Sequence, residues 1–152
     1  MKTFMQIVDA TAKNITEIMP WDLEEKLESE AKPILIDIRE PYEYDAMHIE
    51  DSLLVPRGIL ETACEFNFEE TIPKLAEARD KEIIVLCRSG NRSVLAAAMM
   101  QELGYNNVAS LKTGLRGWND YELTLVDNNS NIVGIDVADD YFRAKLRPEQ
   151  ER

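Results

Sequence analysis

The sequence contains few of the residues that build disulfide frameworks and metal sites. It has 2 cysteines, Cys64 and Cys87, and 1 histidine, His48, among 152 residues. Two thiols cannot form a disulfide framework in a chain of this length, and no cluster of cysteine and histidine has metal-ligand spacing. We therefore expect no bound metal and no structural disulfide network.

Long hydrophobic runs and an excess of basic charge are also lacking. No segment approaches the length of about 20 apolar residues that spans a membrane, and Asp9 ends the N-terminal apolar run too early for a signal peptide. The 17 lysines and arginines face 29 aspartates and glutamates, which gives a net charge of −12. This balance argues against a nucleic-acid partner, which needs basic stripes. We expect a cytoplasmic protein with reduced thiols and no membrane contact.

Apolar segments alternate with helical ones along most of the chain. We expect strands at residues 16–18, 33–38, 52–56, 83–86 and 107–111. We expect helices at residues 1–15, 20–27, 41–47, 71–78, 94–103 and 114–118, and a last helix at 139–146. In the first helix, Phe4, Ile7, Val8 and Ala12 share one face. This alternation predicts an α/β domain with a central, mainly parallel five-stranded sheet flanked by helices, with ligands at the carboxyl ends of the strands.

The segment from Ile83 to Ser93 carries the strongest functional signal. Four apolar residues predict a buried strand, and Cys87 stands where that strand ends. A polar loop with one glycine follows and leads into a helix, so unpaired backbone N–H groups and the positive end of the helix dipole converge on the cysteine. We therefore predict that Cys87 is a thiolate nucleophile.

The loop residues after Cys87 are the predicted substrate-binding residues. Their N–H groups form an anion cradle, and the two guanidinium groups attract an anionic substrate that the acidic chain repels at long range. The predicted binding residues are Arg88, Ser89, Gly90, Asn91, Arg92 and Ser93. Ser93 is also placed to cap the following helix.

Three segments resemble rhodanese domains, in that family's order and spacing. They are Asp37–Ser52, with Arg39, Tyr42 and His48; the loop Cys87–Ser93; and the closing segment Thr113–Trp118. The resemblance covers residues 15–122, so that residues 1–14 are an N-terminal helical extension and residues 123–152 a short C-terminal extension. Met47, Asp51 and Thr113 stand where the family usually has glycine, which puts the local backbone shape in question.

The resemblance implies a sulfurtransferase without a cofactor. The Cys87 thiolate would take sulfane sulfur from thiosulfate or a persulfide, hold it as a persulfide, and pass it to cyanide, a thiol or a sulfur-carrier protein. Two alternatives stay open. One is a non-enzymatic rhodanese-type interaction module. The other is a cysteine-based phosphatase or arsenate reductase, although only four residues separate Cys87 from Arg92 where those enzymes typically have five.

Other candidate residues have structural explanations as well as functional ones. Arg57 lies between Pro56 and Gly58 and is a possible contact at the mouth of the site. We expect His48 to be a hydrogen-bonding scaffold residue rather than a catalytic base, and Asp37 and Arg39 to form an ion pair. Cys64 is expected to be a half-buried hydrophobic residue, with a second sulfur-carrying thiol as the alternative.

Overall fold

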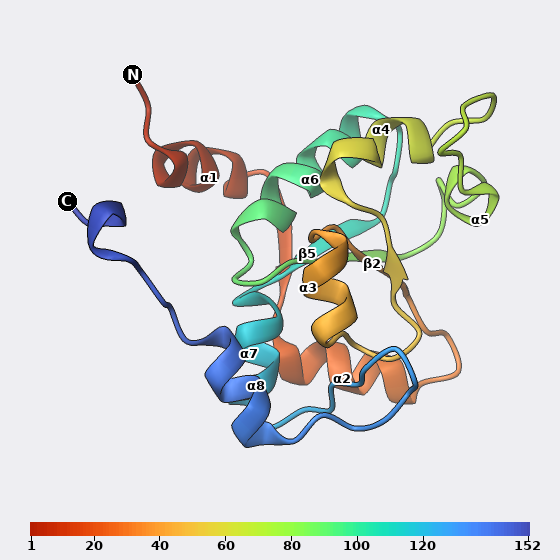
Figure 1. Ribbon diagram of the computed structural model, residues 1–152. Coiled ribbons are helices and arrows are strands. Elements are labelled where there is room, and N and C mark those ends of the chain that lie inside the picture. Colours follow the sequence, from red (N-terminus) through yellow and green to blue (C-terminus); the bar gives the residue numbers. More distant parts are fainter.

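The computed structural model describes residues 1–152 and has a central five-stranded sheet in which every pair of neighbouring strands is parallel (Figure 1). The strands are β1 (Thr16–Ile18), β2 (Ile34–Asp37), β3 (Leu53–Leu54), β4 (Ile83–Leu86) and β5 (Val108–Leu111). Their order across the sheet is β1-β5-β4-β2-β3, so β4 is the middle strand. The expected α/β fold with a parallel five-stranded sheet is confirmed.

Eight α-helices and two short 3₁₀ helices connect and cover these strands. The α-helices are α1 (Phe4–Ala12), α2 (Pro20–Glu28), α3 (Pro41–Ala46), α4 (Leu60–Ala63), α5 (Pro73–Ala76), α6 (Asn91–Glu102), α7 (Gly114–Asp120) and α8 (Ile135–Phe142). The 3₁₀ helices are η1 (Arg57–Ile59) and η2 (Pro148–Gln150). None of the helices is long and apolar enough to cross a membrane.

The sheet has a separate hydrophobic core on each face, because side chains alternate between the faces along each strand. On β4, Ile83 and Val85 join the core beneath α1, α4, α5 and α6, together with Cys87. Ile84 and Leu86 join the other core, beneath α2, α7 and α8. Helices therefore cover both faces (Figure 1), as an all-parallel sheet requires.

The clearest differences from the expected helices are found at α6, α8 and α4. Helix α6 begins at Asn91 rather than at residue 94, because Gly90 adopts a left-handed conformation (φ +87°) and lets the polar residues of the loop form the first turn. Helix α8 spans 135–142 rather than 139–146, because its buried stripe is formed by Ala138 and Phe142, one turn apart. Helix α4, at residues 60–63, is not among the expected helices.

The two terminal segments both pack on the sheet domain. Helix α1 lies against α6 through Val8, which is buried, whereas Phe4 and Ile7 of its expected apolar face are exposed. Helix α8 lies against α7 and buries Phe142. Beyond α8 the chain runs away from the body of the domain (Figure 1). Helices α1 and α8 thus both contribute to the structure around the carboxyl edge of the sheet.

Candidate functional site

Cys87 lies at the carboxyl end of the central strand β4, where ligands of parallel sheets usually bind. The alternation along β4 turns its side chain toward the α6 face, and only 1% of the residue is exposed. The sulfur atom therefore lies at the bottom of the loop that joins β4 to α6. This position matches the one predicted from the sequence.

The loop and the start of α6 surround the Cys87 sulfur with hydrogen-bond donors. The backbone N–H groups of Gly90 and Ser93 donate to Sγ at 3.1 Å and 3.3 Å. The Cys87 thiol in turn donates to the Ser93 hydroxyl at 3.2 Å, and that hydroxyl shares a hydrogen bond of 2.7 Å with the hydroxyl of Ser110 on β5. The two N–H groups and the N-terminus of α6 are placed to stabilise an anion bound at this position.

Helix α7 holds the first residues of this loop in place from outside. The N–H groups of Leu115 and Arg116 donate to the carbonyl oxygens of Cys87 and Arg88, both at 2.9 Å. Gly114 permits this close approach, because a Cβ atom at this position would lie 2.5 Å from the Arg88 carbonyl. The φ of Gly114 is +61°, in the left-handed region that favours glycine. The start of α7 therefore fixes the backbone that carries Cys87.

Two of the unusual residues noted in the sequence keep the backbone shape that glycine favours. Asp51 and Thr113 both adopt a left-handed conformation, with φ of 65° and 67°, whereas Met47 is extended, with φ −170°. A left-handed conformation costs an L-residue about 1–2 kcal/mol. The departures from the family pattern at Asp51 and Thr113 are therefore accommodated by backbone strain rather than by a different turn.

Both arginines of the loop are held by other elements. Arg92 forms two hydrogen bonds of 2.9 Å with the carboxylate of Glu43 on α3. Burial alone would raise the pKa of Glu43, but the bonds from Arg92 and from the Glu40 N–H lower it below its ordinary value. The same contact raises the pKa of Arg92. Arg88 donates from Nη2 to the Phe142 carbonyl of α8 at 2.6 Å.

A cavity of about 260 Å³ opens over Cys87. Four of the predicted binding residues line it together with the cysteine: Arg88, Ser89, Asn91 and Arg92. The remaining two, Gly90 and Ser93, act on Sγ through their N–H groups. The cavity also has one lining residue that was not predicted from the sequence, Phe4 of α1.

The other candidate residues lie outside this cavity. Arg57 forms an ion pair of 3.0 Å with Glu61, so its contact with substrate stays a prediction. His48 accepts or donates at Nδ1 to the Tyr44 carbonyl at 2.8 Å and stacks on the Tyr44 ring, as expected of a scaffold residue. Asp37 and Arg39 form the expected ion pair, which is completely buried.

Cys64 is more buried than the sequence suggested. It is fully enclosed in the core on the α6 face rather than half-buried, because Leu75 and Tyr105 belong to the same cluster there. Burial raises the pKa of its thiol. A buried thiol of this kind is chemically inert, which does not suit a second sulfur carrier.

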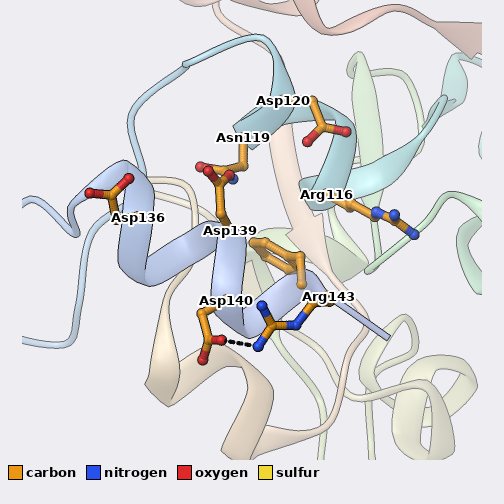
Figure 2. Close-up of a pocket in the computed structure, with 8 residues that line it drawn as sticks. Arg116, Asn119, Asp120, Asp136, Asp139, Asp140 and Arg143 are labelled. Carbon is orange, nitrogen blue, oxygen red and sulfur yellow. Dashed lines mark hydrogen bonds and ion pairs between the residues drawn. The ribbon is translucent and has the colours of Figure 1, made fainter. Parts of the chain in front are cut away.

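A second cavity, of about 450 Å³, lies between α7 and α8 (Figure 2). Its charged lining consists of Arg116, Asp120, Asp136, Asp139, Asp140 and Arg143. Two of its acids are paired: Asn119 donates to Asp139 at 2.6 Å, and Arg143 to Asp140 at 2.5 Å. No group of three or more histidine, cysteine or acidic side chains in the chain is arranged to hold a metal ion.

Comparisons with known proteins agree with this geometry. The family model described as "Rhodanese-like domain" matches residues 19–121. A protein of Allochromatium vinosum named "Sulfurtransferase" is 30% identical over 112 residues, which cover 74% of this chain and 95% of that protein. A Mycobacterium tuberculosis protein named "Probable adenylyltransferase/sulfurtransferase MoeZ" is 31% identical over 109 residues, but the match spans only 26% of its length.

A solved structure from Rhodopseudomonas palustris has a similar fold, with a TM-score of 0.69 and 27% identity over 80% of this chain and 92% of that one. That protein is described as one of unknown function and as a "Possible Tyrosine Phosphatase". The family match spans most of the chain and includes the strand, the loop and the closing helix that enclose Cys87. The chain belongs to the rhodanese-like domain family.

Proposed function

We propose that this chain is a sulfurtransferase that carries sulfane sulfur as a persulfide on Cys87. The donor is thiosulfate or a persulfide, and the acceptor is a thiophile such as cyanide, a thiol or a sulfur-carrier protein. The observation that carries the proposal is the pair of backbone N–H groups, of Gly90 and Ser93, that donate to Sγ within 3.3 Å. Family membership and a relative named as a sulfurtransferase support it.

The reaction transfers one sulfur atom without a change in total electron count. The Cys87 thiolate attacks the outer sulfur of the donor, whose sulfur–sulfur bond breaks and releases sulfite or a thiolate. The new terminal sulfur carries the negative charge, and the N–H groups of the loop stabilise it as an oxyanion hole stabilises an oxygen anion. The acceptor then attacks that sulfur and restores the Cys87 thiolate. In this scheme no metal or organic cofactor is required.

The phosphatase alternative has one observation in its favour, the likeness to the Rhodopseudomonas palustris protein described as a possible tyrosine phosphatase. The geometry around Arg92 speaks against it. One bond from each terminal nitrogen of that guanidinium goes to Glu43 at 2.9 Å, so the bidentate face that these two N–H groups form is already occupied by a carboxylate. We expect no turnover of aryl phosphates. Hydrolysis that disappears in Cys87→Ser would overturn the sulfurtransferase assignment.

Intact-mass measurement after exposure to thiosulfate or a persulfide donor tests the proposal directly. The wild-type chain should gain one sulfur atom, about 32 Da, and dithiothreitol should remove it. Cys64→Ala is the matched control, because it removes a buried thiol and should retain the gain. Cys87→Ala should lose it. No gain in the wild type, or a gain kept by Cys87→Ala, contradicts the proposal and leaves the non-catalytic interaction module as the better explanation.

A further inference from the structure

Helix α1 places an aromatic side chain at the mouth of the Cys87 cavity. Phe4 lines that cavity, although half of the residue is exposed to solvent. Its position is set by the helix, because Val8, one turn further on, is buried against the core on the α6 face. Val8 and Ala12 also line an adjoining hollow with Ser89, Gly90 and Asn91. The helix is thus seated beside the active-site loop and presents one apolar wall to any bound substrate.

The charge inside the same cavity is smaller than the two arginines suggest. Glu43 neutralises Arg92 through two hydrogen bonds of 2.9 Å. This leaves Arg88 as the one cavity-lining cation without a carboxylate partner, since its Nη2 donates to a neutral carbonyl. The chain as a whole carries a charge of −12. The cavity therefore suits a thiolate and a sulfur donor that together carry one negative charge better than a thiolate and a donor that together carry three.

These two features distinguish between the donor classes. A thiolate and thiosulfate together carry three negative charges, and thiosulfate has no apolar part that could contact Phe4. A thiolate and a protonated organic persulfide, R–S–SH, together carry one charge, and the R group is available for contact with an aromatic ring. We propose that the donor is an organic persulfide whose apolar R group lies against Phe4, and that Phe4 selects for that group.

This inference rests on the proposed function and specifies its donor. The step is R–S–SH + Cys87–S⁻ → R–S⁻ + Cys87–S–SH. The new bond joins Cys87 Sγ to the outer sulfur, the R–S bond to that sulfur breaks, and its electron pair leaves with the R–S⁻ thiolate. During the transfer the proton stays on the moved sulfur, so the charge is −1 on both sides; the proton is then released to solvent, which leaves the persulfide anion next to the loop N–H groups. No external oxidant or reductant is needed.

The test compares kcat/KM for three donors: benzyl persulfide, methyl persulfide and thiosulfate. The wild-type chain should prefer benzyl over methyl persulfide, and both over thiosulfate. Phe4→Ala should lower the benzyl-to-methyl ratio by about tenfold, the lower end of the range expected when an apolar contact with substrate is lost. Phe66→Ala is the matched control, because Phe66 is equally exposed, at 49% against 50%, but lies outside the cavity. It should leave the ratio unchanged.

A second variant tests the charge argument independently of Phe4. Glu43→Gln keeps an oxygen for the Glu40 N–H, which donates to Glu43 at 2.9 Å, but releases the full charge of Arg92. It should raise the thiosulfate-to-methyl-persulfide ratio of kcat/KM several-fold. Both ratios compare substrates within one variant, so a general loss of folded protein does not move them.

The outcomes separate the inference from the proposed function. If no donor places sulfur on Cys87, both are wrong. If sulfur transfer occurs but Phe4→Ala and Phe66→Ala leave the benzyl-to-methyl ratio equally unchanged, the role of Phe4 is overturned while the sulfurtransferase stands. If the wild type prefers thiosulfate to both persulfides, the donor class is overturned. A ratio that falls in Phe4→Ala alone, with persulfides preferred, supports the inference.

Discussion

The contact between Gly114 and the loop that follows Cys87 gives a prediction whose size follows from the structure. Gly114→Ala would place a Cβ atom 2.5 Å from the Arg88 carbonyl group and 2.6 Å from the Cys87 carbonyl oxygen, at a φ of +61°. The left-handed conformation costs about 1–2 kcal/mol for an L-residue, and forcing extra atoms into a filled site costs about 1–3 kcal/mol. We expect a total loss of about 2–5 kcal/mol.

Gly104→Ala separates the two costs. Gly104 has a φ of +90°, but a Cβ atom there would meet nothing within 4 Å. It should therefore show the conformational cost alone, about 1–2 kcal/mol. Both variants and the wild type would be unfolded in urea, and sulfur uptake on Cys87 would be followed by intact mass. Because the backbone that must move in Gly114→Ala carries Cys87, that variant should also take up sulfur more slowly.

Two results of the comparison between Gly114→Ala and Gly104→Ala would contradict the prediction. If Gly114→Ala destabilises the chain no more than Gly104→Ala, the loop and α7 are not in the close contact described. If Gly114→Ala is strongly destabilised but its folded fraction takes up sulfur at the wild-type rate, the closing helix stabilises the fold without positioning the cysteine. Either result would refute the reasoning.

Three further predictions follow from individual contacts. Because the pKa of Glu43 is lowered in the folded chain, the Glu43–Arg92 pair stabilises the fold at a pH above the ordinary carboxyl range, and this stabilisation is lost as the pH falls through the pKa of the folded state. The free energy of unfolding in urea should therefore decrease more steeply between pH 6 and about 3 for the wild type than for Glu43→Gln. Thr113→Gly should raise the free energy of unfolding by about 1 kcal/mol by removing left-handed strain; a loss instead would contradict that strain. Phe142→Ala should cost about 3–5 kcal/mol, because the side chain is buried; a cost below 1 kcal/mol would show that α8 is dispensable.

Much of the fold and the centre of the candidate site could be predicted because their signals are local. The apolar run before Cys87 and the glycine three residues after it indicate a strand and a tight loop in any α/β chain. The bounds of α8 were predicted wrongly because local signals do not show which residues meet another helix. Its buried stripe depends on which residues meet α7, and the charged residues at 139, 140 and 143 made a later start equally compatible with the sequence.

The partners of the site residues could not be predicted, because they come from distant parts of the chain. Arg92 meets Glu43, 49 residues away, and Arg88 meets the Phe142 carbonyl, 54 residues away. A backbone carbonyl that accepts a hydrogen bond cannot be recognised from the sequence. The sequence places Phe4 on an apolar helix face, which gives no indication that it lines the Cys87 cavity instead of the core.

The bond from Arg88 to the Phe142 carbonyl has a practical consequence for anyone shortening the protein. The family match ends at residue 121, before α8, and begins at residue 19, after α1. A fragment cut at those limits would remove the acceptor of Arg88 next to Cys87 and expose apolar surface on both faces of the sheet. The smallest piece expected to behave as an independent protein is therefore about residues 3–143, from the residue that caps α1 to the one that ends α8.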